Sequence, residues 1–161
     1  MRRFMYAIVS TLLVTSIIPS ASAKLPPSSA EADSIIHSAA YPNRVKVTSA
    51  TYHVGLKVGS SGLSEIRFNI PENAPAKIQF GRVKVADARG QLIATESSGD
   101  GNNLMIRFTQ PVAVGTTLEI DLEGVRTSDL LGRTWLFPMY GRRGGATQDF
   151  PLGTARIQTY Q

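Results

Sequence analysis

Apolar side chains recur at every second position along four short segments, and this pattern restricts the fold more than any other feature of the chain. The segments are residues 66–70, 83–85, 104–108 and 118–122. Alternation of this kind is typical of β-strands that bury one face and leave the other in water. We therefore expect a strand at each place, with one face turned toward a core.

Further strands are expected at residues 45–58, 78–80, 91–95, 134–139 and 154–159, with turn sequences rich in Gly, Pro, Asn and Asp between the segments. About seven to nine short strands without a long helical pattern predict an all-β domain, an antiparallel immunoglobulin-like β-sandwich. A small β-barrel is the alternative, because strand periodicity is the same in both folds.

The first 23 residues have the layout of an export signal. Arg2 and Arg3 precede an apolar stretch over residues 4–18, and small residues at Ala21 and Ala23 follow it. This order predicts a signal peptide, residues 1–23, formed as a signal helix and cleaved after Ala23. A retained membrane anchor is the alternative, but a spanning helix needs roughly 20 apolar residues. No stable membrane span is expected after cleavage.

Two regions are expected after the signal. Residues 24–44 begin with a Pro- and Ser-rich stretch typical of a linker, and we interpret them as an N-terminal arm. Within the arm, residues 31–40 are compatible with one or two helical turns, capped by Asp33 and ended by Pro42. Residues 45–161 then form the β-sandwich domain.

Composition excludes several kinds of site. The chain has no cysteine, which excludes disulfides, thiolate metal sites and cysteine nucleophiles, and its two histidines are His37 and His53. The signal holds two of the 17 basic residues and none of the 12 acidic ones. Residues 24–161 therefore carry a net charge of +3. So small and scattered a charge argues against a nucleic-acid partner.

The segment FTQPVAVGTT at residues 108–117 resembles the F-x-x-P-V-x-x-G-T-T signature of an exported cyanobacterial family, labelled domain of unknown function 2808. Residues 66–74 and 83–85 before it, and 135–138 and 152–157 after it, follow the order of that family. The resemblance covers residues 50–160 and implies an exported β-domain. It implies no activity and supplies no catalytic residue.

The sequence offers two acidic groups that could carry chemistry. Asp100, Asn102 and Asn103 place oxygen atoms in a glycine-flanked loop, as weak candidates for calcium ligands. A plain hairpin turn is favoured there, because no complete calcium-loop pattern is present. A second group, Glu119, Asp121 and Glu123, alternates along one strand and is interpreted as a solvated face, opposite Arg67 or Arg107.

A third candidate is a ligand surface formed by Arg133, Tyr140, Arg142 and Arg143. Arginine and aromatic side chains together suit an acidic polysaccharide, lipid headgroups or a protein partner. The alternative is that Trp135 and Phe137 are core residues and the arginines only keep a loop soluble.

These observations predict an exported, non-enzymatic binding or structural module of the periplasm or cell envelope, with the thylakoid lumen or the cell exterior as other destinations. No cofactor and no catalytic residue are expected, since no G-x-S-x-G motif accompanies His53. An envelope protein or a polysaccharide is the candidate partner. Two alternatives stay open: a calcium-stabilised adhesion or glycan-binding domain, and a hydrolase that acts on envelope glycans.

Overall fold

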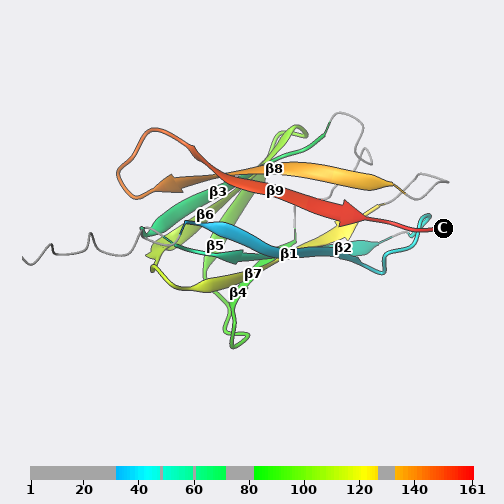
Figure 1. Ribbon diagram of the computed structural model, residues 1–161, viewed down its shortest axis with the longest axis horizontal. Coiled ribbons are helices and arrows are strands. Elements are labelled where there is room, and N and C mark those ends of the chain that lie inside the picture. The colour runs from blue at the N-terminus through cyan, green and yellow to red at the C-terminus, as the bar shows by residue number, and fades with distance from the viewer. Residues whose placement is uncertain (1–31, 48, 60, 72–81, 127–132) are drawn as a thin grey trace, which may run out of the picture.

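The computed structural model describes residues 32–47, 49–59, 61–71, 82–126 and 133–161, which form nine strands and no helix (Figure 1). One sheet has the strand order β1 (Ser34–Tyr41), β2 (Ala50–Lys57), β7 (Thr117–Val125), β4 (Val83–Asp87). The other has the order β5 (Thr95–Gly99), β6 (Asn103–Val112), β3 (Leu63–Asn69), β8 (Thr134–Arg143), β9 (Phe150–Gln158). All neighbouring strands are antiparallel. The predicted all-β sandwich of two antiparallel sheets is confirmed.

The core lies between the two sheets and is built from the alternating positions. On β7, Leu118, Ile120 and Leu122 are buried, and β6 and β8 follow the same rule. The Tyr52 and Phe137 rings meet edge to face at 5.8 Å between centroids and join β2 to β8 across the core. Edge-to-face packing of this kind adds to the hydrophobic gain from burying the rings.

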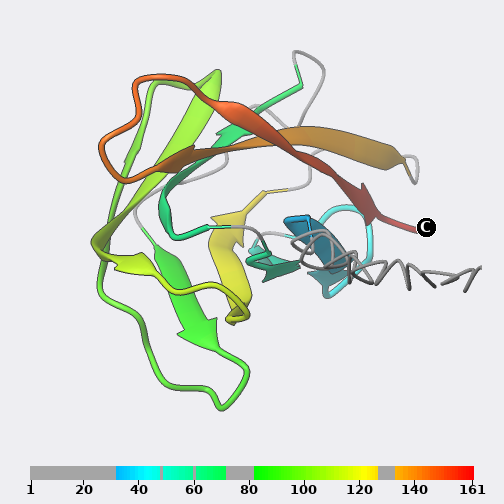
Figure 2. The same ribbon diagram turned by 60° about the vertical axis from the view of Figure 1, so that its left-hand side comes forward.

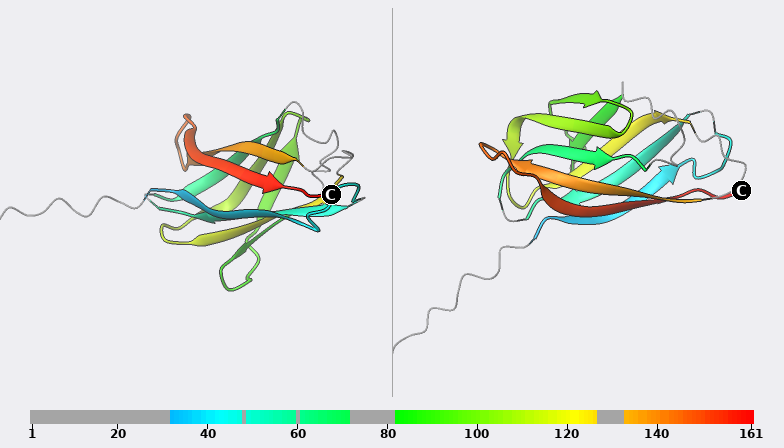
Figure 3. Two further views of the ribbon diagram at one scale, coloured as in Figure 1. Left: turned by 45° about the vertical axis from the view of Figure 1, so that its right-hand side comes forward. Right: turned by 90° about the horizontal axis from the view of Figure 1, so that it is seen from above.

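The two sheets meet along one side, where β1 and β9 lie side by side (Figures 1 and 3). Each of these strands is the edge of its own sheet. Figure 2 shows the turn that follows β4 projecting from the molecule on the side away from β9. Side chains from both sheets can therefore lie next to each other along β1 and β9.

The prediction of helical turns in a loose arm was wrong over residues 34–41. This segment is strand β1, which pairs with β2 along its whole length. An extra residue at Ile36 forms a β-bulge between Ile35 and His37, which breaks the period-two pattern in the sequence. The sandwich of the described chain thus includes Ser34–Tyr41, a segment that the sequence assigned to the arm.

Two other strand predictions were displaced. The expected strand 45–58 begins only at Ala50, because Lys46 has a positive φ of 60° in the turn before it. The expected strand 91–95 is mostly a connection in which Leu92 makes an isolated bridge to Ala86, and β5 starts at Thr95. The predicted strand 78–80 and the signal 1–23 lie outside the described residues. In the part of the chain that the structure describes, no helix is long and apolar enough to cross a membrane.

Candidate functional site

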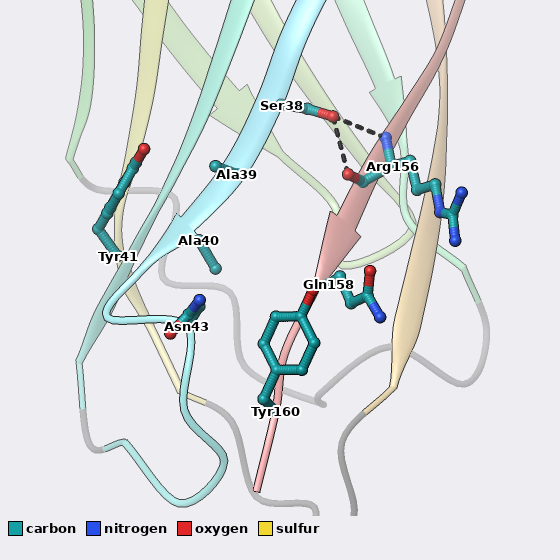
Figure 4. A pocket seen from close by; sticks show the side chains of 8 residues that line it. All are labelled: Ser38, Ala39, Ala40, Tyr41, Asn43, Arg156, Gln158 and Tyr160. Atoms are coloured by element: carbon teal, nitrogen blue, oxygen red, sulfur yellow. Dashed lines mark hydrogen bonds between the residues drawn. The ribbon is translucent and has the colours of Figure 1, made fainter.

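An open groove of about 360 Å³ lies between the C-terminal ends of β1 and β9 (Figure 4). The Ser38 hydroxyl joins the two edges, since it donates to the Arg156 carbonyl at 2.8 Å and accepts from the Arg156 amide at 3.0 Å. The groove is lined by Ser38, Ala39, Ala40, Tyr41, Asn43, Arg156, Gln158 and Tyr160. It thus combines two aromatic rings with amide, hydroxyl and guanidinium groups.

The two tyrosine side chains of the groove are accessible to a ligand. Tyr41 is 64% exposed and Tyr160 is 51% exposed. Among the described residues, no acidic side chain forms an ion pair with Arg156. Its guanidinium can therefore donate hydrogen bonds to an anionic ligand. The Tyr160 backbone is held firmly, because its amide donates to the Asn43 carbonyl at 2.7 Å and its carbonyl accepts from the Val45 amide at 2.7 Å. These two hydrogen bonds fix the position of the Tyr160 main chain on one side of the groove.

The arginines that the sequence grouped as a ligand surface serve ion pairs of the sandwich. Arg142 pairs with Asp149 at 2.7 Å and with the buried Glu65 at 3.1 Å. The hydrogen bond that Arg142 donates to Asp149, helped by the charge of Glu65, raises the pKa of Arg142 above its usual value. Arg143 reaches Asp33 at 3.3 Å. Both arginines thus form ion pairs that connect β8 to other parts of the sandwich.

The other members of that group also lie against neighbours. The Arg133 guanidinium lies 5.9 Å from the centre of the Trp135 ring, and Tyr140 lies beneath the Arg67 guanidinium at 4.9 Å. Trp135 and Phe137 are 2% and 3% exposed, so both are core residues. The interpretation of the two aromatic residues as core is confirmed.

The Asp100 loop has the geometry of a hairpin turn between β5 and β6. One carboxylate oxygen of Asp100 accepts from the amides of Asn102 at 2.9 Å and Asn103 at 2.7 Å, and the other accepts from the Asn103 side chain at 3.3 Å. The Asn102 amide makes the largest contribution to lowering the pKa of Asp100 below its usual value. Both carboxylate oxygens are therefore occupied within the turn.

A cluster that the sequence did not predict lies on the outer face of the four-stranded sheet. We call it the histidine cluster: His37 from β1, His53 from β2 and Glu119 from β7, whose ligand-type atoms all lie within 4.8 Å of one another. Glu119 Oε2 is 3.1 Å from His37 Nε2 and 3.0 Å from His53 Nε2. Asp121 supports the cluster, since its Oδ1 lies 2.5 Å from His53 Nδ1.

Sheet register explains why the cluster forms. His37 is paired with Gly55, and Gly55 is paired with Glu119, so the three residues form one row across three strands. A Cβ atom on Gly55 would lie 2.3 Å from the His37 ring, so only glycine leaves room for the ring above β2. The bulge at Ile36 turns His37 outward, whereas strict alternation from the inward-facing Ile35 would point it at the core.

The acidic side chains on the outer face of β7 have other partners than the sequence predicted. Glu123 pairs with Lys84 and with Arg82 at 3.4 Å, and the hydrogen bond from Lys84 lowers the pKa of Glu123. The expectation that Arg67 or Arg107 lies opposite this face was wrong. These two arginines lie on the other sheet, where Arg67 pairs with Asp149 at 2.9 Å and Arg107 with Glu65 at 3.3 Å.

His53 has acids beside it, as a hydrolase would require, but not a nucleophile. In the described part of the chain, no serine hydroxyl forms a hydrogen bond with His53. His37 lies above it with ring centroids 5.1 Å apart, and Tyr41 meets it edge-on at 6.4 Å. The cluster therefore resembles a set of ligands more than a nucleophilic triad.

The comparisons with known proteins identify a family and a fold. A family model described as protein of unknown function, DUF2808, matches residues 29–158. A comparison with the curated proteins finds no match. Among solved structures, the chain is similar to the major pilin SpaD of Corynebacterium diphtheriae, with 12% identity, a TM-score of 0.50, and coverage of 81% of this chain and 34% of the pilin. The chain thus spans about a third of that pilin's length.

Two further structures are less similar. The collagen-binding domain of a Staphylococcus aureus adhesin has 7% identity and a TM-score of 0.44, over 84% of this chain and 100% of the domain. A DUF4466 family protein from Parabacteroides merdae has 15% identity and a TM-score of 0.45, over 81% of this chain and 46% of that protein. At such low identity, the similarity to the pilin establishes a shared fold and nothing more.

Proposed function

This chain belongs to the DUF2808 family of proteins of unknown function, and we propose that it is an exported, non-catalytic binding module of the cell envelope. Its ligand is an acidic polysaccharide, held in the groove between β1 and β9. The observation that carries this proposal is an open groove lined by two exposed tyrosines and by Arg156, an arginine without an ion-pair partner among the described residues.

The chemistry of the groove fits a sugar chain that bears carboxylate groups. Tyr41 and Tyr160 offer flat, half-apolar faces of the kind that pack against sugar rings. Asn43 and Gln158 each offer both a donor and an acceptor, which matches the hydroxyl groups of a saccharide. Arg156 can bind a carboxylate with two parallel hydrogen bonds.

Binding of polygalacturonate or alginate tests this function. We expect Arg156→Gln to weaken binding about tenfold or more, because a hydrogen bond to a charged group contributes about 1.5–3 kcal/mol. Tyr160→Ala should also weaken it, while the backbone bonds of residue 160 remain possible. The measurement is isothermal titration calorimetry in EDTA, so that no metal ion bridges protein and polysaccharide.

Arg89→Gln is the matched control, because Arg89 is an exposed arginine in the turn after β4, away from the groove. It should bind like the unchanged protein. Equal affinity for a neutral glucan, or an Arg156→Gln variant that binds normally, would contradict the proposal.

Export is supported by the N-terminal sequence, and its test is the N-terminus of the protein in its native host. We expect the processed chain to begin at Lys24. Ala23→Phe should leave most of the protein as precursor, because the residue before the cleaved bond must be small. Ala7→Phe is the control, since a bulky apolar residue is acceptable in the apolar stretch. A purified protein that still begins at Met1 would refute export by this signal.

A further inference from the structure

We propose that His37, His53 and Glu119 bind a divalent transition-metal ion of the zinc class on the outer face of the four-stranded sheet. The site adjoins the polysaccharide groove at Tyr41, whose ring meets His53 edge-on, and shares no residue with the Asp100 turn. Asp121 acts behind it as the residue that orients His53.

The distances between the three side chains suit one ion. In a tetrahedral zinc site with bonds of about 2.0–2.1 Å, neighbouring ligand atoms lie about 3.3 Å apart. The Nε2 atoms of His37 and His53 lie 3.1 and 3.0 Å from the same oxygen of Glu119. Three adjacent strands hold these atoms, so small side-chain rotations are enough to place them around a cation.

One carboxylate oxygen of Glu119 has no hydrogen-bond donor among the residues that the structure describes. This oxygen, Oε2, is buried and accepts no hydrogen bond, although two ring nitrogens lie within 3.1 Å. A buried carboxylate oxygen without a donor costs free energy. A cation bound between this oxygen and the two nitrogens removes that cost.

Asp121 sets which nitrogen of His53 can bind metal. A carboxylate can only accept, so His53 Nδ1 must carry the proton in their hydrogen bond. In the neutral ring, Nε2 then keeps its lone pair, and it is Nε2 that faces Glu119. Metal-binding histidines commonly have such a carboxylate behind them, which fixes the tautomer and strengthens the ligand.

The ligand set selects the metal. Two imidazoles and one carboxylate suit zinc and similar transition-metal ions, whereas calcium prefers oxygen ligands alone. His37 is 45% exposed at its side chain, so the fourth position of the ion is open to water or to a group from outside. The bound ion would also tie the edge strand β1 to β2 and β7.

The test uses the full chain, purified without a polyhistidine tag and stripped of metal with EDTA. Titration with zinc chloride should show one ion bound per chain and a raised melting temperature. His37→Gln, His53→Gln and Glu119→Gln should each weaken zinc binding at least about 100-fold. Asp121→Asn should weaken it about 10- to 100-fold, as is typical of an outer partner. Because the chain has two histidines and no cysteine, a zinc-induced shift of both imidazole signals in NMR locates the ion.

Glu123→Gln is the matched control, since Glu123 lies two residues from Asp121 on the same strand face but pairs with Lys84 and Arg82. It should bind zinc within about twofold of the unchanged protein. The proposal is overturned if zinc produces no binding signal. It is overturned equally if Glu123→Gln and Glu119→Gln lose the same affinity. Should Glu119→Gln fail to fold, the exposed His37→Gln decides the question.

Discussion

Replacement of Phe68 by alanine is expected to lower the free energy of unfolding by about 3–5 kcal/mol. Phe68 is 1% exposed and lies on β3, which is the central strand of the five-stranded sheet. Its neighbours in the register are Leu104 on β6 and Met139 on β8. Flanking strands on both sides restrain the sheet from closing over the cavity, so the loss should be near the upper end of the range for core truncations.

Urea unfolding, followed by circular dichroism, measures this loss. The midpoint should fall while the slope of free energy against urea stays the same, since the surface exposed on unfolding is nearly unchanged. Leu92→Ala is the control, because Leu92 is 70% exposed and should change stability by less than about 0.5 kcal/mol. Equal losses for the two variants would mean that Phe68 is not part of a packed core.

The sequence predicted the fold where one face of a strand is apolar and the other polar. Residues 104–108 and 118–122 alternate without interruption, and both lie inside strands whose apolar side chains are buried. It misplaced β5, whose sequence TESSG contains no apolar side chain. Such an edge strand pairs through its main chain with β6, and main-chain pairing leaves no periodic signal in the sequence.

Strand β1 was missed for a different reason. Ile35 faces the core, and the bulge at Ile36 shifts every later residue of β1 by one position relative to strict alternation. The small residues Ser38, Ala39 and Ala40 also give little contrast between the two faces. A bulge is decided by the partner strand, so a pattern within one segment cannot reveal it.

The candidate sites depend on β1, which explains why sequence reasoning found neither. His37 and Tyr41 are contributed by this strand, and the groove needs β9 from the other sheet. Within the sequence, the spacing of His53 and Gly55 is the one feature that points to the histidine cluster. It places a histidine two residues from a glycine on the same strand face, and the glycine leaves space beside the histidine ring. The sequence indicated an arginine-rich ligand surface instead. In the structure, one of those arginines, Arg142, forms ion pairs with Glu65 and Asp149.

Replacement of Gly55 by alanine should weaken zinc binding at least about 100-fold while leaving the fold almost unchanged. The new Cβ would occupy the place of the His37 ring, 2.3 Å from its nearest atom, and so force the ring away from Glu119. Because His37 is a half-exposed side chain on an edge strand, moving the ring costs little. Alanine in a strand also gains about 0.5–1 kcal/mol over glycine. The stability of the metal-free protein should therefore change by less than about 1 kcal/mol.

A double-mutant cycle with His37→Gln separates this effect from general damage. If Gly55→Ala acts only by displacing His37, it should cost no further zinc affinity once His37 has been replaced. Gly144→Ala is the control, since its Cβ would meet nothing nearer than Pro111 Cγ at 3.7 Å, and it should bind zinc normally. Normal zinc binding by Gly55→Ala would show that the ion, if bound, does not use His37. An additive loss in the double variant would instead place the effect of Gly55 on β2 itself.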